Sequence, residues 1–432
     1  MTRDEIVEAV LVVLRDHMER PHLEAFGPEA RLNEDLYLDS ILMLHLFLNL
    51  ELHFGLAAPE EAITRQELST VANLAALFAG ERAPAAAAEA PEGQGVHGED
   101  YVDIKVHCFV SCVCAALKER GIDHRAFYFG VFDADFALTP EFTLRYHAPT
   151  VSHAFFRRWF ERLYGATLRE WHDPKKSKET NVSTLLDLVD RRRPDERVMV
   201  MLDLFHLPER ENKFNQNPFP HYLMLENAED DPDVFEVLDP DFRWEGRIEK
   251  AKVLNAVRQP TVGGGYVFDA SALRPARPAD LAAYIATCRQ TTGNPLVEAV
   301  RTIVAAHLDG RGGLTLQTLP EALKELPVLS IRKYAYEHAF AFLWRALKLP
   351  DAEFQAWCDD IETLALGLKG LNFQVLKLVE TGDRSLAAPL FAELDRYDRL
   401  ESAIKRRLDE AFAQWRDDAG LPALPQTERA IA

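Results

Sequence analysis

Three residues that lie far apart in the sequence, Cys108, His221 and Asp239, are of the types that act together in nucleophilic catalysis. Cys108 follows a strand-like run and begins a segment that predicts a helix ending at Gly121. The backbone dipole at a helix start stabilises a thiolate, which is the form a nucleophilic cysteine needs. The alternative is a cysteine that only packs as a small hydrophobe, and for Cys112 and Cys114 on the same helix we prefer it.

His221 begins the predicted strand HYLMLE, and Asp239 ends the next predicted strand, VFEVLDPDF. If these strands form a hairpin, the imidazole can take the thiol proton while the carboxylate fixes its tautomer. Without Cys108, His221 would be an ordinary strand histidine and Asp239 with Pro240 an ordinary turn. The order Cys, His, Asp favours a catalytic triad.

Ser40 follows Asp39 at the start of a predicted amphipathic helix in the segment LNEDLYLDSILMLHLFLNLELHFGL. The positively polarised helix start would stabilise the phosphodiester of a prosthetic group attached to this serine. The alternative is that Asp39 and Ser40 only cap the helix.

The surroundings of Ser40 favour attachment, because residues 1–80 resemble the acyl and peptidyl carrier protein family. The resemblance rests on D-L-x-x-D-S-[IL] from Asp35 to Ile41, on Phe54-Gly55, and on Ser69-Thr70-Val71 with Leu74. It implies a covalent 4'-phosphopantetheine on Ser40, added by a phosphopantetheinyl transferase. Carrier proteins usually have acidic residues after the serine, whereas this chain has the apolar run Ile41 to His45. An apolar face on that helix would suit a dedicated partner, and the nearest one is on the same chain.

The Cys108 segment, the His221 strand and Asp239-Pro240 resemble the papain-like fold of the C39 peptidases. They are more similar to the butirosin biosynthesis protein H family and to the condensing enzymes of petrobactin-type siderophore pathways. This resemblance implies acyl transfer from a carrier thioester to an amine. An oxyanion donor before Cys108 is not evident, so we expect the Cys108 backbone N–H and one further group to serve.

The fold class that these patterns predict is multidomain. We expect an all-α, four-helix carrier bundle at residues 1–80 and a flexible Ala/Pro/Glu/Gly linker at 81–100. A papain-like α+β catalytic domain at 101–275 and a helical C-terminal domain at 276–432 would follow. The helical periodicity of the last part breaks at Gly310 to Gly313 and near Pro350 and Gly382.

Composition narrows the class of protein. A net charge of −20 offers no basic surface for nucleic acid or for anionic lipid. No apolar run approaches the roughly 20 residues that span a bilayer, and no signal peptide opens the chain, so we expect no membrane span and a cytoplasmic protein. Five cysteines, an odd number in a long chain, predict free thiols.

Weaker motifs give weaker predictions. Gly263-Gly264-Gly265 precedes a strand-like run, which favours a tight turn over a phosphate loop. The basic run from His172 to Lys178 is a solvated loop or, less favoured, a contact for the pantetheine phosphate. No Cys/His pair with ligand spacing follows Cys112 and Cys114, so we expect no metal site.

The function we predict is a carrier-dependent acyltransferase of natural-product or siderophore biosynthesis. It would move an acyl group from its own carrier domain to a small-molecule amine such as a polyamine or an aminoglycoside. The acidic surface would attract such a cation. A separate adenylating enzyme would load the acyl group. The alternatives are a thioesterase or cysteine peptidase of papain-like fold, and a non-catalytic scaffold in which Cys108 is structural.

Overall fold

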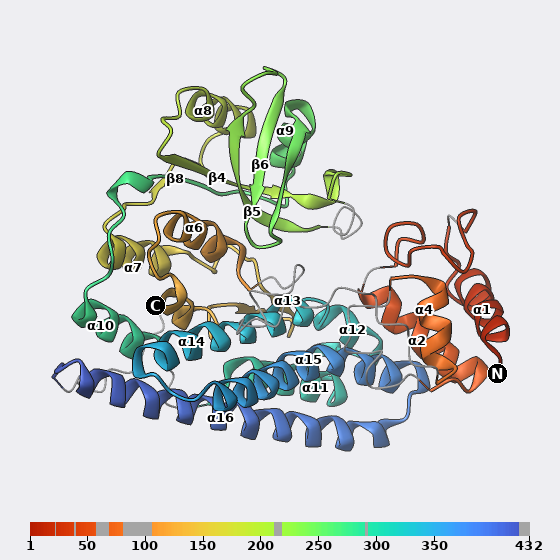
Figure 1. Cartoon of the computed structure of the whole chain (residues 1–432). Helices are drawn as coiled ribbons and strands as arrows, with labels where there is room; N and C mark the ends of the chain where they lie inside the picture. The colour runs from red at the N-terminus through yellow and green to blue at the C-terminus, as the bar shows by residue number, and fades with distance from the viewer. Residues whose placement is uncertain are drawn as a thin grey trace.

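The computed structural model describes residues 1–21, 23–38, 40–57, 69–80, 106–210, 218–289 and 293–422. These residues form a small helical part at the N-terminus, a central sheet flanked by helices, and a layer of long C-terminal helices (Figure 1). The predicted multidomain, mainly helical architecture with a central α+β part is therefore confirmed. The predicted linker at 81–100 lies outside the described residues.

The N-terminal part is a helical bundle around a single apolar cluster. Its helices in the described residues are α1 (Arg3–Val12), the π-helical continuation η1 (Val13–His17), α2 (Ser40–Phe54) and α4 (Val71–Phe78). Thr2 and Glu5 form a capping box at the start of α1, which satisfies backbone N–H groups that the helix itself leaves unpaired. The described part of residues 1–80 shows no fourth helix, so the predicted four-helix count stays a prediction.

The central part contains a six-stranded sheet in the order β3-β8-β4-β5-β6-β7, with every neighbouring pair antiparallel. The strands are β3 (Arg169–Glu170), β4 (Glu196–Asp203), β5 (Pro220–Asn227), β6 (Val234–Asp239), β7 (Trp244–Glu249) and β8 (Gly265–Asp269). The predicted hairpin is present as β5 and β6, whose register pairs Met224 with Leu238. A separate pair, β1 (Ala137–Leu138) and β2 (Leu144–Arg145), lies outside this sheet.

Both faces of the sheet are covered because side chains alternate along each strand. On one face, Met199, Tyr222 and Met224 pack into the core that contains α6 (Cys108–Glu119) and α7 (Ala154–Tyr164). On the other face, Val198, Leu223 and Leu225 pack against helices that carry a second core. These are α8 (Lys178–Asp190) and α9 (Lys250–Arg258), seen with the sheet at the top of Figure 1.

Long helices make up the C-terminal part, and their ends fall where the sequence predicts breaks. Gly310 follows the end of α11, Pro350 caps the start of α15, and Gly382, with φ +63°, ends α15 in the left-handed region that favours glycine. The helices are α10 (Pro278–Cys288), α11 (Pro295–Leu308), α12 (Leu319–Ala322), α13 (Leu326–Ser330), η7 (Ile331–Tyr334), α14 (Ala335–Leu347), α15 (Asp351–Thr381) and α16 (Ala387–Asp418).

The central part and the C-terminal helices share one continuous core. Tyr284 of α10 donates a hydrogen bond to the Phe127 carbonyl at 2.6 Å. Lys333 of η7 lies within ion-pair distance of both Asp133 and Glu401, and all three side chains are buried. The two regions that the sequence treats as separate domains are therefore packed as one body.

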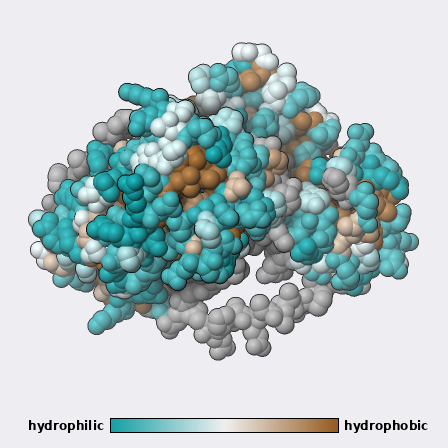
Figure 2. Space-filling view, turned by 90° about the horizontal axis from the view of Figure 1, so that it is seen from above, coloured by the Kyte–Doolittle hydropathy of each residue, from teal (hydrophilic) through white to brown (hydrophobic). Residues whose placement is uncertain are grey.

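The face shown in Figure 2 is mostly hydrophilic, with small hydrophobic patches. Among the described residues, the large apolar side chains that are exposed are Met1, Leu52 and Leu138. No helix in this part of the chain combines the length and the apolar composition needed to cross a membrane.

Candidate active site

Cys108 is the first residue of α6, and its helix is held at both ends. At the start, one oxygen of buried Asp241 accepts hydrogen bonds from the Val106 and His107 amides at 3.2 and 3.3 Å. The same oxygen accepts a bond from the Ser111 hydroxyl at 2.6 Å, and burial raises the pKa of Asp241. Asp241 therefore fixes the backbone on which Cys108 sits.

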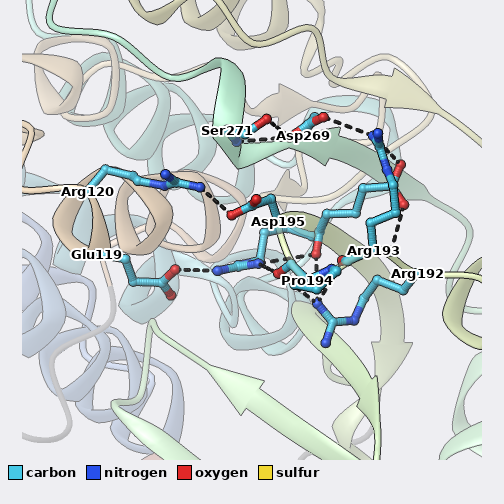
Figure 3. Close-up of polar contacts among 10 residues, drawn as sticks. Glu119, Arg120, Arg192, Arg193, Pro194, Asp195, Asp269 and Ser271 are labelled. Carbon is cyan, nitrogen blue, oxygen red and sulfur yellow. Dashed lines mark hydrogen bonds and ion pairs between the residues drawn. The ribbon is translucent and has the colours of Figure 1, made fainter.

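At its other end, α6 is joined to the sheet by ion pairs between side chains (Figure 3). Glu119 pairs with Arg197 of β4 at 2.6 Å, and Arg120 pairs with Asp195, just before that strand. Each pair has at least one partner that is more than a third exposed and contributes little stability alone, so their main effect is on the orientation of the helix.

His221 and Asp239 meet across the β5–β6 hairpin. The register brings the end of β6 beside the start of β5, and His221 Nε2 lies 2.8 Å from Asp239 Oδ1. The other oxygen of Asp239 accepts from Arg210 Nη2 at 2.9 Å, and both partners are buried. Because Asp239 occupies Nε2, the imidazole has Nδ1 left for another partner, and Cys108 lines the same pocket. The structure thus brings together all three residues of the predicted triad.

The pKa of His221 distinguishes it from the other histidines of the pocket. Burial lowers the pKa of His221, but the charge and hydrogen bond of Asp239, with a further contribution from Cys108, outweigh burial and raise it to about 10. Burial lowers the pKa of His107 and His147 and brings that of His153 to about 3. His221 alone among these four is built to accept and hold a proton.

A pocket opens beside Cys108 and His221, and the C-terminal helices form one of its walls. That wall consists of Val328 of α13 with Ile331 and Arg332 of η7. Burial lowers the pKa of Arg332 to about 10, so the guanidinium remains charged at neutral pH. Its Nη1 donates to the carbonyls of Ala134 and Asp135 at 3.4 and 3.1 Å, and within the described residues it has no carboxylate at ion-pair distance.

Sequence reasoning missed Asp241, Arg210 and Arg332. Asp241 had a visible signal, since it stands two residues after Asp239 in the same Asp-Pro-Asp turn. Arg332 had none, because only the shared core brings η7 to the pocket.

The other cysteines lie away from the pocket surface. Cys112 and Cys114 are buried in α6, where burial raises the pKa of both thiols. All five cysteines are free, as predicted. The described residues contain no group of three or more His, Cys, Asp or Glu side chains that could hold a metal ion.

Ser40 is the first residue of α2, and Asp39 lies outside the described residues. The loop before it is closed by Asp35, which accepts from the Arg31 backbone at 2.8 Å and pairs with its guanidinium at 2.9 Å. A serine at the first position of a 15-residue helix suits a phosphate-linked group, since the helix dipole stabilises an anion there.

Comparisons with known proteins identify the class to which the chain belongs. Residues 103–273 match the family model of the DUF6005 N-terminal domain, and residues 279–429 match that of the DUF6005 C-terminal domain. The second model accounts for the helices that form the pocket wall.

Two proteins of Bacillus anthracis are similar to different lengths of the chain. Petrobactin synthase is 39% identical over 315 residues, which are 73% of this chain and 96% of that protein. Acyl carrier protein AsbD is 34% identical over 74 residues, which are 17% of this chain and 81% of that protein. The chain belongs to the petrobactin synthase family, and its resemblances to petrobactin-type condensing enzymes and to carrier proteins are confirmed.

Proposed function

We propose that this protein is a carrier-dependent acyltransferase of siderophore biosynthesis that forms an amide. The acyl group would move from a thioester on its own carrier domain to a small-molecule amine. The observation that carries the proposal is His221, the one pocket histidine with a raised pKa, set between Asp239 and Cys108. The similarity to petrobactin synthase and to an acyl carrier protein supports a carrier-linked role in siderophore biosynthesis.

Ser40 is the residue that would hold the phosphopantetheine, with the N-terminus of α2 stabilising its phosphate. When bound, this group supplies a flexible thiol that carries the acyl group as a thioester. A phosphopantetheinyl transferase and an acyl-adenylating enzyme would be the partners that prepare the carrier domain.

The first half-reaction transfers the acyl group to Cys108. His221 holds the proton that the Cys108 thiol gives up, and Cys108 Sγ forms a bond to the thioester carbonyl carbon. As the carbon–sulfur bond of the donor breaks, His221 returns the proton to the departing thiol. Asp239 keeps the imidazole oriented, because His221 Nε2 is held at 2.8 Å.

The second half-reaction forms the amide. The amine nitrogen bonds to the acyl carbon, its proton passes to His221, and the bond from that carbon to Cys108 Sγ breaks with return of the proton to sulfur. In both halves the carbonyl oxygen becomes negative. The Cys108 backbone N–H and the charged guanidinium of Arg332 are the groups that would stabilise this charge.

The test loads wild-type protein with an acyl group and follows protein and products by mass spectrometry. With coenzyme A and a promiscuous phosphopantetheinyl transferase, the wild type should gain one phosphopantetheine and Ser40→Ala none. Cys108→Ala and His221→Ala should load normally but transfer slower by on the order of a thousandfold, and Asp239→Ala by a smaller factor. Cys112→Ala is the matched control and should stay close to wild type.

A panel of amines, including polyamines and aminoglycosides, separates transfer from hydrolysis. An amide with one of them supports the proposal. Release of free acid at the same rate with or without amine would replace it by the thioesterase alternative, and full activity in Cys108→Ala would move the chemistry away from this cysteine.

A further inference from the structure

Helix α2 of the carrier domain packs against α15 of the C-terminal helices. Phe373 and Leu376 of α15 belong to the apolar cluster of the carrier domain, together with Leu44 and Phe47 of α2. Both α15 side chains are buried, at 7% and 3% exposure. The apolar core of the carrier domain therefore extends onto another part of the chain.

An ion pair lies at the edge of this apolar contact. Lys377 Nζ is 2.5 Å from Glu51 Oε1, and the two side chains are 35% and 23% exposed. Glu51 is the one acidic residue in the sequence of α2. Phe373, Leu376 and Lys377 are three and four residues apart, so they share one face of α15, which we call the α15 docking face.

We propose that the α15 docking face is the surface on which the catalytic body receives its carrier domain, with Lys377 selecting the carrier through Glu51. Burial of Phe373 and Leu376 supplies the attraction, and the ion pair supplies the selectivity, because an exposed pair adds little affinity but penalises a like charge. The proposal rests on the proposed function, because a docked carrier domain delivers an acyl group only if the protein is an acyltransferase.

The same helix connects this face to the pocket. Helix α15 also packs against α13 and η7, the two elements that form the C-terminal wall of the pocket. A carrier domain held on α15 thus rests on the element that backs the active site. The C-terminal helices then have two tasks, since they complete the pocket and hold the acyl donor.

The relatives give a reason for such a surface. The similarity to petrobactin synthase covers 96% of that protein, and the similarity to acyl carrier protein AsbD covers 81% of that protein. Two parts that are joined in this chain therefore correspond to two separate proteins. A tether raises the local concentration of a carrier but does not orient it. The α15 docking face would orient the carrier domain, because its apolar side chains and its charged edge fix the direction in which α2 lies.

The experiment reverses charges in the full-length, acyl-loaded protein. Lys377→Glu and Glu51→Lys are made singly and together, with Arg399→Glu as the control. Arg399 is exposed on the neighbouring helix α16, so its reversal changes net charge equally without touching the docking face. A carbodiimide, which joins only carboxylates and amines in direct contact, reports docking without any need for catalysis.

The wild type and Arg399→Glu should give a cross-linked peptide that joins Glu51 to Lys377. Each single reversal should lose that peptide and slow single-turnover acyl transfer by about fivefold, and the double reversal should restore both. Single reversals that transfer at the wild-type rate, or a wild type without the cross-link, would overturn the proposal. A wild type that shows the cross-link but forms no amide would instead refute the proposed function and leave the docking face in place.

Discussion

At the scale of single residues, the charge state of His221 depends on neighbours rather than on burial. It is more buried than His107, His147 and His153, and it is the one with a carboxylate at 2.8 Å. An imidazole that holds its proton places a positive charge in the pocket that Cys108 also lines. Asp239 is in turn fixed by Arg210, so Arg210 helps to set the orientation of the His221 imidazole through Asp239.

This environment makes a prediction about pH and stability. The pKa of His221 rises from 6.5 to about 10 on folding, so its protonated form stabilises the fold fully below pH 6.5, and the effect is lost as pH rises to about 10. Urea unfolding should show that His221→Gln costs most stability near pH 6.5 and progressively less toward pH 10.

The control is His153→Gln. Burial brings the pKa of His153 to about 3, so this residue stays neutral throughout the same range and its substitution should have a constant effect. A cost for His221→Gln that does not change with pH would contradict the prediction.

Sequence reasoning reached Cys108, His221 and Asp239 because each sits at the end of a regular element. Helix starts and strand ends have local signals, and a hairpin between successive strands is the simplest pairing. Sequence reasoning missed Asp241 because one short turn holds two buried aspartates with different partners. Asp239 contacts His221, whereas Asp241 contacts the start of α6. Which aspartate faces which partner depends on packing that the sequence does not display.

At the scale of elements, the glycine run at the start of β8, Gly263 to Gly265, has a different role from the one predicted. None of the three glycines has a positive φ, and the turn ends before them. An added Cβ on Gly265 would lie 2.1 Å from the Trp171 ring, and one on Gly264 would lie 2.2 Å from the Tyr222 hydroxyl. The absence of side chains at Gly264 and Gly265 lets two aromatic side chains pack directly on the backbone. The prediction of a tight turn at these positions is wrong.

Alanine substitutions in this glycine run should therefore lower the free energy of unfolding by clearly different amounts. Gly265→Ala should lower the free energy of unfolding by about 1–3 kcal/mol, because the ring of Trp171 has to move. Gly263→Ala should cost less, since its Cβ would meet His172 at 3.3 Å. Thermal unfolding of the two variants tests the order, and equal losses would show that crowding is not the cause.

At the scale of the whole molecule, buried charges join the central part to the C-terminal helices. Lys333 donates to Asp133 at 3.0 Å, to Glu401 at 2.5 Å and to the Phe132 carbonyl at 2.8 Å. Its neighbour Arg332 lines the pocket instead. Two successive residues of η7 thus have different roles: Lys333 joins the two parts of the protein, and Arg332 forms part of the pocket wall.

Removal of Lys333 tests whether these parts unfold together. Lys333→Met removes the cation 2.5 Å from buried Glu401 and leaves Lys405 at 2.7 Å from Asp133, and it should cost about 3–5 kcal/mol in chemical unfolding. Lys324→Met, which removes a more exposed pair with Glu321, should cost less than about 1 kcal/mol. An effect of Lys333→Met no larger than that of the control would mean that the network does not hold the two parts together.

The shared core has a consequence for how such genes can recombine. A crossover between residues 273 and 279, where the two family matches meet, would divide one core between two parents and remove Arg332 from its pocket. A crossover in the Ala/Pro-rich stretch at 81–100 would exchange the carrier domain and leave the catalytic body whole. Under the proposed function, new acyl donors would be exchanged at that junction, and the proposed docking face would favour carriers with an acidic residue that can meet Lys377.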